Sequence, residues 1–206
     1  MMRGKIEDLF VLEQPTNQLC FKTDALYKRL ISAAEFFGFT YLPDELRIQM
    51  KKCDKNEFNN KRKTLLGGEN DQIIAFTCNV NQIFFLEYRF VENQYSHKAY
   101  NAVIIHESIH VFQAYYSELP PSQYVWLYES VACYLAGQKI AYNPQKNVSW
   151  NNFVEEFYNI ENCYGLAYKF GEALFRLYGD EVLCILKSPE EYEDKLIEVY
   201  NSIFLK

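Results

Sequence analysis

The spacing of apolar residues changes near Tyr95, and this change constrains the fold more than any other feature of the sequence. Before Tyr95, apolar residues alternate with polar ones or gather in β-branched and aromatic runs, as in strands, at 46–52, 72–80 and 82–90. After Tyr95, apolar residues recur at helical spacing in segments near 97–116, 123–140, 150–178 and 189–202. We therefore expect an α+β fold with the sheet in the N-terminal half and helices in the C-terminal half.

The N-terminal half contains further signals of local structure. Thr23 and Asp24 can cap a helix that runs to Phe37 and ends at Gly38. The last two strand-like runs are spaced as in a β-hairpin. We expect residues 20–92 to form a small mixed or antiparallel sheet with a helix against it. A basic cluster between 51 and 63, interrupted by acidic residues and asparagines, is interpreted as a solvated hairpin or loop.

Two helix starts are predicted in the C-terminal half. Pro120 and Pro121 separate the first two helices there and leave Ser122 as a natural N-cap. Ser188, followed by Pro189, matches a capping box with proline at the first helical position.

The length and composition indicate one globular domain. A chain of 206 residues, 49% hydrophobic and 23% charged, can bury a sizeable core. We expect a single domain, 1–206, made of an α/β sublobe at about 1–95 and a helical sublobe at about 96–206. The oligomeric state is left open.

The net charge and the absence of long apolar runs argue against nucleic acids and membranes as partners. The net charge of −6 and the isoelectric point near 5.2 are unfavourable for binding nucleic acids or anionic membranes. Acidic residues at Glu7, Asp8 and Glu13 interrupt the N-terminus where a signal peptide needs an apolar stretch, and no run approaches the roughly 18 apolar residues of a membrane span. The cysteines form no CxxC pair. A cytoplasmic protein with free thiols is predicted.

The segment AVIIHESIHVFQAYY contains HExxH as His106, Glu107, Ser108, Ile109 and His110. Residues four apart on a helix lie about 40° apart around its axis, so the two imidazoles can bind the same metal ion. Glu107 lies about 100° away from His106, which places its carboxylate beside the metal as a general base and not as a ligand. His97 lies nine residues before His106 and is interpreted as a surface or helix-start residue.

A catalytic zinc site needs a third protein ligand and one open position. Glu129 follows His110 by nineteen residues, in VWLYESVACYLAG on the next predicted helix. A tight turn between the helices would bring Glu129 to the two histidines. Glu118 is the alternative ligand, but it lies at the turn, whereas apolar residues flank Glu129 as they would in a buried site. The prediction is one Zn²⁺ held by His106, His110 and Glu129.

HExxH, eighteen residues and then glutamate resembles the gluzincin pattern of aminopeptidase and leukotriene-hydrolase type metallopeptidases. WLYESVACYLAG is similar to the stretch around their third ligand. The resemblance implies that Glu107 acts as general base and acid. It also implies an oxyanion-stabilising tyrosine at the start of a later helix, for which Tyr164 in NCYGLAYKFGEALFRLYG has the similar setting, and Tyr158 and Tyr168 are the alternatives.

The resemblance also implies a fold. It implies a zincin-like domain with its active site in the cleft between the two lobes, and an edge strand, either 73–78 or 83–87, that pairs with extended substrate. One element of the aminopeptidases is absent. The glycine-x-methionine-glutamate-asparagine strand that binds a substrate's free amine has no counterpart in the sequence. Aminopeptidase specificity is therefore not predicted.

The expected function is hydrolysis of a peptide bond in a peptide or protein substrate by a zinc-activated water. Two alternatives share the same metal site. One is a binding or regulatory module that keeps the zinc and the fold without catalysis. The other is hydrolysis of a non-peptide amide or ester.

Overall fold

The structure is a computed structural model that describes residues 10–12, 23–39, 48–67, 73–79, 81–117, 119, 122–142 and 148–204. It has the α+β composition predicted from the sequence, with a small sheet and a larger number of helices. The chain divides into two compact units, Met1–Phe112 and Gln113–Lys206, and the division falls inside helix α3 (His97–Tyr116). None of the described helices is long and apolar enough to cross a membrane.

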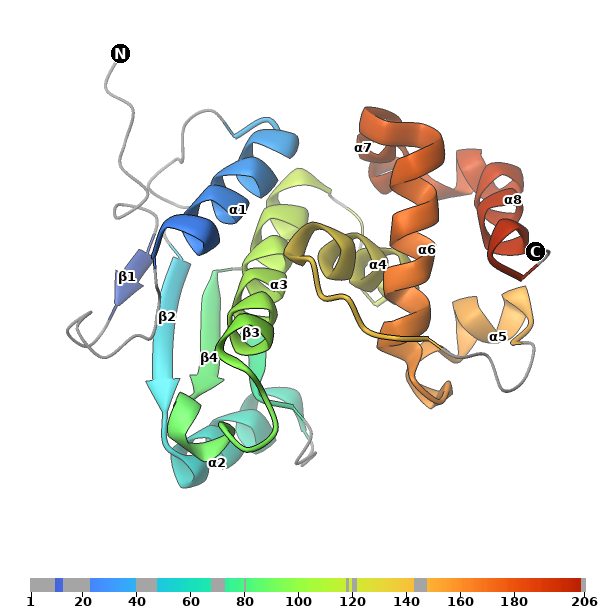
Figure 1. Ribbon diagram of the computed structural model, residues 1–206. Helices are drawn as coiled ribbons and strands as arrows, with labels where there is room; N and C mark the ends of the chain where they lie inside the picture. Colours follow the sequence, from blue (N-terminus) through green and yellow to red (C-terminus); the bar gives the residue numbers. More distant parts are fainter. Residues whose placement is uncertain are drawn as a thin grey trace, which may run out of the picture. The chain divides into compact units, whose positions relative to one another are not determined.

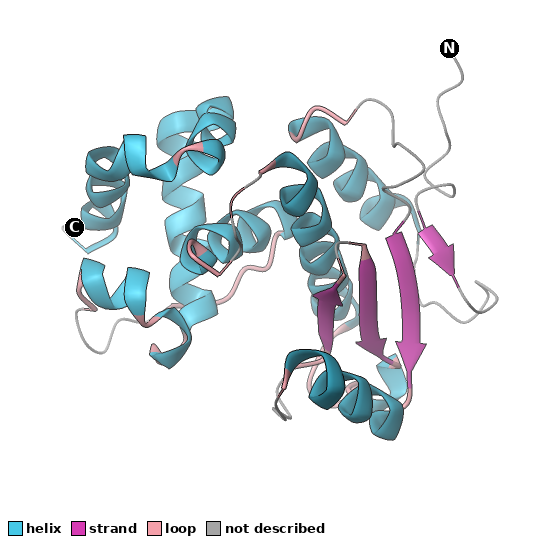
Figure 2. Cartoon of the chain, turned by 180° about the vertical axis from the view of Figure 1, so that it is seen from behind, coloured by secondary structure: helices cyan, strands magenta, loops and turns pink. Residues whose placement is uncertain are grey.

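The first unit contains a mixed sheet in the strand order β1-β2-β4-β3 (Figures 1 and 2). Its strands are β1 (Phe10–Leu12), β2 (Ile48–Cys53), β3 (Ala75–Cys78) and β4 (Gln82–Leu86). β1, β2 and β4 run parallel, and β3 pairs antiparallel with β4 in the predicted hairpin. β4 ends at Leu86, so the predicted strand at 82–90 is too long: Tyr88–Phe90 forms a 3-10 turn.

The two faces of this sheet are covered by different helices. Thr77, on β3, hydrogen-bonds α3, and α1 (Thr23–Phe36) lies on this same face (Figures 1 and 2). Phe76 points to the opposite face because side chains alternate along a strand. There its ring stacks on Phe84, 5.3 Å away, and meets Phe58 of α2 (Lys55–Leu66) at 5.2 Å. Helices therefore pack on both faces of the sheet.

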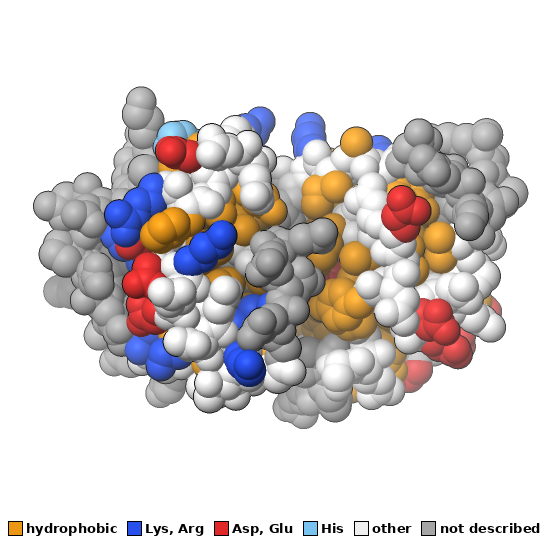
Figure 3. Space-filling view, turned by 90° about the horizontal axis from the view of Figure 1, so that it is seen from below, with side chains coloured by type: hydrophobic (Ala, Val, Ile, Leu, Met, Phe, Trp, Pro, Cys, Tyr) orange, Lys and Arg blue, Asp and Glu red, His pale blue; other side chains and the backbone are white. Residues whose placement is uncertain are grey.

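The basic cluster belongs to regular structure, so its interpretation as a hairpin or loop is wrong. Its residues lie on β2 and α2. Asp54 starts α2 by accepting hydrogen bonds from the N–H groups of Asn56 and Glu57, and Gly67 ends it in the left-handed conformation. Lys and Arg side chains on this side of the molecule stand among acidic and hydrophobic ones (Figure 3), but Arg62 is buried.

The second unit is helical. After the last residues of α3 come α4 (Val125–Ala136), α5 (Trp150–Glu155), α6 (Cys163–Tyr178), α7 (Val182–Lys187) and α8 (Glu193–Phe204). An aromatic cluster fills the space between several of these helices. Trp126 of α4 packs on Phe170 of α6 at 5.6 Å, and Phe153 of α5 packs on Tyr200 of α8 at 5.3 Å. This cluster holds α4, which carries one of the predicted metal ligands.

Helices α4 and α6 approach closely at Gly171. A β-carbon on Gly171 would meet the backbone carbonyl oxygen of Ser130, and it would lie 3.0 Å from the β-carbon of Tyr134. Only glycine allows the two backbones to pack at this distance. Ser130 is next to Glu129, so the position of that residue depends on this contact.

Several helix boundaries differ from the prediction. The segment 150–178 is two helices, because Glu156 ends α5 and Asn162, in the left-handed conformation, caps α6. α4 starts after Tyr124, not at Ser122, and has no side-chain cap. Ser188 makes no side-chain cap either, since Pro189–Tyr192 is a 3-10 turn before α8. The predicted helix at 97–116 is confirmed without change.

Candidate metal centre

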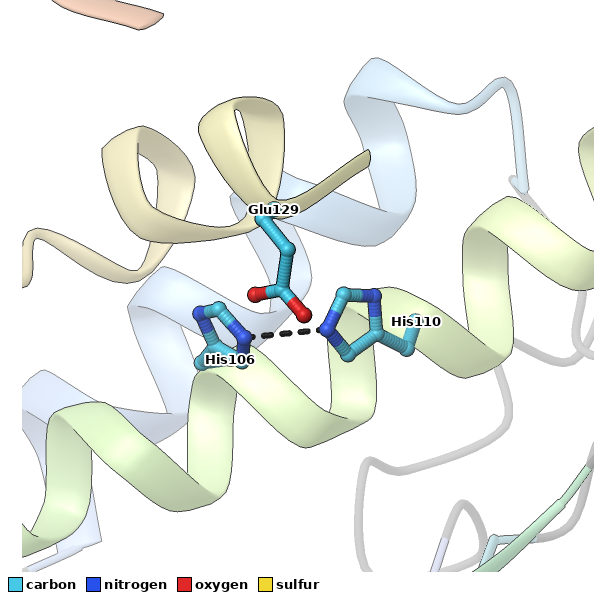
Figure 4. A group of neighbouring side chains, drawn as sticks. All are labelled: His106, His110 and Glu129. Atoms are coloured by element: carbon cyan, nitrogen blue, oxygen red, sulfur yellow. Dashed lines mark hydrogen bonds between the residues drawn. The ribbon is translucent and has the colours of Figure 1, made fainter. Parts of the chain in front are cut away.

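Helix α3 supplies the two histidines. Along its apolar stripe, Ile105, Ile109 and Phe112 are buried and Tyr116 is half-buried. His106 is buried and His110 is half-buried. Their Nε2 atoms lie 2.9 Å apart, so both rings point one nitrogen to the same place (Figure 4).

Glu129 comes from α4 and is buried with 6% of its surface exposed. One ligand atom from each of His106, His110 and Glu129 lies within 4.8 Å of the other two. Figure 4 shows the Glu129 carboxylate extended from α4 toward the two imidazoles. The three predicted ligands therefore form a cluster that could hold a metal ion.

The second unit contains contacts that fix α4 to the end of α3. The side-chain amide of Gln113 donates a hydrogen bond to the backbone carbonyl of Tyr128 at 2.9 Å, and the Tyr128 hydroxyl lies 2.7 Å from the Ser117 hydroxyl. All three residues are buried. Tyr128 immediately precedes Glu129, so these bonds set the backbone that carries the third ligand.

The donor set fits zinc. Two imidazole nitrogens and one carboxylate are a common combination in catalytic zinc sites, where a fourth position stays open. Zn–N bonds of 2.0–2.1 Å at a tetrahedral angle separate two ligand nitrogens by about 3.3 Å. The observed separation of 2.9 Å between the imidazole nitrogens is within a small side-chain rotation of that value. Burial of His106 and Glu129 also favours a metal, because a buried carboxylate needs a compensating charge.

Tyr158 contacts the ligand carboxylate. It lies in the 3-10 turn Phe157–Asn159, and its hydroxyl donates a hydrogen bond to Oε1 of Glu129 at 2.8 Å. Of the three tyrosines weighed from the sequence, this one is placed at a predicted ligand. Tyr164 lies in the first turn of α6, half-buried, with its ring centre 6.5 Å from that of Tyr158. Tyr168, one turn later, is buried.

The thiol of Cys163 is close enough to feel the charge of Glu129. Burial, with a smaller contribution from the negative charge of Glu129 and against backbone hydrogen bonds that lower it, raises the pKa of this thiol to about 11. The thiol therefore stays protonated at neutral pH.

Glu107 is half-buried on α3, one residue after the first histidine. Its Oε2 atom accepts a hydrogen bond of 2.7 Å from the hydroxyl of Thr77 on β3, and its backbone carbonyl lies 2.9 Å from the same hydroxyl. The carboxylate is thus held from the sheet side of the helix.

Other candidates from the sequence lie outside the cluster. His97 is exposed at the start of α3 with its ring stacked on Tyr88 at 4.0 Å, as expected for a surface or helix-start histidine. Glu118, the alternative third ligand, lies outside the described residues. Five described cysteines are free, which agrees with the prediction of free thiols: Cys53, Cys78, Cys133, Cys163 and Cys184.

The sequence analysis did not identify two residues of this centre, Thr77 and Gln113. It named Tyr158 but did not predict the contact of Tyr158 with Glu129. Thr77 is thirty residues from Glu107, and no local pattern links the two. Gln113 does carry a signal, because it is a polar residue within an apolar stretch of the predicted helix. Such a residue must find a hydrogen-bond partner in the core.

Comparison of the chain with protein-family models, with curated proteins and with solved structures found no match in any of the three.

Proposed function

We propose that this protein is a zinc-dependent metallopeptidase of the gluzincin type, with His106, His110 and Glu129 as ligands and Glu107 as general base. The observation that carries the proposal is the buried histidine–histidine–glutamate cluster, whose ligand atoms lie within 4.8 Å of one another. The HExxH spacing supports the same conclusion because it places a second, non-ligating carboxylate, that of Glu107, next to the cluster.

When bound, a zinc ion in such a site lowers the pKa of a coordinated water to about 7 and polarises a substrate carbonyl. The remaining chemistry is assigned to the side chains. The Glu107 carboxylate takes a proton from the attacking water and then gives it to the leaving amine nitrogen. The resemblance assigns stabilisation of the developing oxyanion to a tyrosine hydroxyl, Tyr164 or Tyr158.

The first unit offers a place for an extended substrate. Within the described residues, β3 pairs on one side only, with β4, whereas β4 lies between β2 and β3. Of the two candidate edge strands, 73–78 is therefore the one at the edge. β3 also carries Thr77, which touches the proposed base. A peptide that pairs with β3 would lie beside Glu107, and this arrangement supports a zincin-like fold for the domain.

The proposed substrate is a peptide or protein, and the proposed compartment is the cytoplasm. A non-catalytic zinc module and a hydrolase of other amides would use the same ligands. They differ from a peptidase in what Glu107 does and in which bond is cleaved. The two measurements that follow separate a peptidase from these two alternatives.

The first measurement is the zinc content of the purified wild type, of His106→Ala and of Glu107→Gln. We expect one equivalent of zinc in the wild type and in Glu107→Gln, and a loss of at least tenfold in affinity for His106→Ala. The control is His97→Ala, which alters a histidine outside the cluster. Equal zinc in His106→Ala and the wild type would contradict the ligand assignment.

The second measurement is cleavage of a mixture of synthetic peptides by the zinc-loaded protein, with the products identified by mass spectrometry. The wild type is expected to cleave, and Glu107→Gln is expected to retain zinc while losing at least a hundredfold in rate. Zinc binding without cleavage of any peptide would favour the non-catalytic module or a hydrolase of other amides over a peptidase. Cleavage that survives in Glu107→Gln would remove the general base from its role.

A further inference from the structure

The hydroxyl of Thr77 makes the closest polar contact to the proposed general base. It lies 2.7 Å from Oε2 of Glu107 and 2.9 Å from the backbone carbonyl oxygen of the same residue. Both partners are acceptors, so the hydroxyl must donate its single proton to them. The shorter bond goes to the carboxylate, and a hydrogen bond to an ionised carboxylate is stronger than one to a neutral carbonyl.

The position of Thr77 in the sheet explains why its hydroxyl is held firmly. Thr77 pairs with Ile83 of β4, which is fully buried, and its side chain shares the sheet face that α3 covers. A β-branched residue in a strand has restricted χ1 freedom. The hydroxyl is therefore fixed by the strand and not by a flexible side chain.

Glu107, in contrast, has a long side chain with three rotatable bonds and is only half-buried. A carboxylate that must receive a proton from water at one defined place gains from a contact that fixes one oxygen and leaves the other available. The bond from Thr77 occupies Oε2, so Oε1 remains for the water. The second bond, to the backbone carbonyl, ties the strand to the helix at the same residue.

We propose that Thr77 positions the Glu107 carboxylate for proton transfer and thereby links the edge strand β3 to the general base. This inference rests on the proposed function of Glu107. It adds a positioning residue that acts through Glu107 and does not itself touch the metal ligands. A substrate that pairs with β3 would then contact the same strand that holds the base.

The kinetic test compares Thr77→Val, which keeps the shape and removes the hydroxyl, with Thr77→Ser, which keeps the hydroxyl. The substrate is the peptide that the wild type cleaves fastest in the mixture described above. We expect Thr77→Val to lower kcat about tenfold with KM and zinc content unchanged, and Thr77→Ser to recover at least half of the wild-type kcat. The matched control is Thr64→Val on the exposed side of α2, where the hydroxyl bonds only the Asn60 carbonyl within its own helix.

A second test needs no activity. Urea unfolding of the wild type, Thr77→Val, Glu107→Ala and the double variant forms a double-mutant cycle for the two side chains. The bond to the backbone carbonyl survives in Glu107→Ala, so the cycle reports the contact with the carboxylate alone. We expect the shift in urea midpoint caused by Thr77→Val to be clearly smaller in the Glu107→Ala background than in the wild type.

The outcomes separate the two proposals. If the wild type cleaves and Thr77→Val equals both Thr77→Ser and the wild type in kcat, the positioning role is overturned. If the wild type cleaves no peptide, the proposed function fails, and the unfolding cycle alone decides whether Thr77 holds Glu107. Additive midpoint shifts in that cycle would overturn the inference in either case.

Discussion

Gln113 donates a buried hydrogen bond from its side-chain amide to the backbone carbonyl of Tyr128, at 2.9 Å. Gln113 lies one turn after His110 on α3, and Tyr128 immediately precedes Glu129 on α4. One side chain thus ties the helix that carries the histidines to the backbone that carries the carboxylate. A centre assembled from two helices needs such a bond, because its ligands must keep their separation while no metal is bound.

Replacing Gln113 with methionine should weaken zinc binding. Methionine has a similar length and fills the space, but it cannot donate to the Tyr128 carbonyl. We expect the zinc dissociation constant to rise about tenfold and the free energy of unfolding of the apoprotein to fall by about 1 kcal/mol. Competition with a chromogenic chelator measures the first quantity and urea unfolding the second. Gln123→Met, at an exposed position, is the control. An equal rise of the zinc dissociation constant in Gln123→Met would contradict the role of Gln113 in holding the site.

Tyr158→Phe tests the hydrogen bond to Glu129 Oε1. Tyr158 is 59% exposed, so loss of the hydroxyl should leave the free energy of unfolding nearly unchanged. Loss of a bond that orients a ligand carboxylate should raise the zinc dissociation constant about tenfold. Tyr178→Phe in α6 is the control. Unchanged zinc affinity in Tyr158→Phe would show that this bond does not orient the ligand.

A comparison of Tyr158→Phe with Tyr164→Phe tests which tyrosine stabilises the oxyanion. The resemblance to gluzincins predicts that Tyr164→Phe keeps its zinc and loses about a hundredfold in kcat. Peptide cleavage at saturating zinc separates the two residues. A loss of kcat in Tyr158→Phe with normal turnover in Tyr164→Phe would assign the role to Tyr158.

Gly171→Ala should destabilise the second unit. The added β-carbon would meet the Ser130 carbonyl oxygen, which belongs to the backbone of α4 and cannot rotate away. Separation of α4 from α6 should lower the free energy of unfolding by about 3 kcal/mol. Thermal and urea unfolding measure this loss. Glu172→Ala, the neighbouring exposed position, removes only a surface ion pair with Lys169 and should cost less than about 1 kcal/mol.

The parts of the centre that the sequence predicts are those with local signals. His106 and His110 follow from the four-residue repeat of one helix, and the hairpin of β3 and β4 follows from two short apolar runs with a polar turn. Thr77 could not be predicted, because its contact with Glu107 depends on how a strand and a helix thirty residues apart pack together. Glu129 is an intermediate case. Its apolar flanking residues and its spacing of nineteen residues from His110 indicate a ligand, but only the packing of α4 brings it to the histidines.

The errors in the fold have local causes. α2 contains few apolar residues, chiefly Phe58, Leu65 and Leu66, so apolar periodicity does not reveal it. Its start was nevertheless visible, because Asp54 followed three residues later by Glu57 resembles a capping box. The break between α5 and α6 has a weaker signal, since Asn162 adopts the left-handed conformation that asparagine tolerates better than most residues.

The buried thiol of Cys53 should make stability depend on alkaline pH. Burial, together with the negative charges of Glu57 and Asp54 and against the opposing lysines, raises the pKa of Cys53 from 9.0 to about 12. Above pH 9 the unfolded chain loses this proton while the folded protein keeps it. The contribution is therefore complete below pH 9 and is lost as the pH rises, by about 1.4 kcal/mol at pH 10.

The measurement is urea unfolding of the wild type and of Cys53→Ala at pH 8 and pH 10. Cys53→Ala lacks the titrating group, so the stability difference between the two proteins should shrink by about 1.4 kcal/mol over this range. Cys184→Ala, which removes an exposed thiol, is the control for the loss of a cysteine. If the stability difference between the wild type and Cys53→Ala is the same at both pH values, the Cys53 thiol reaches solvent in the folded state. Cys53 is fully buried at the end of β2. A thiol that reaches solvent would therefore mean that α2 covers this end of β2 less tightly.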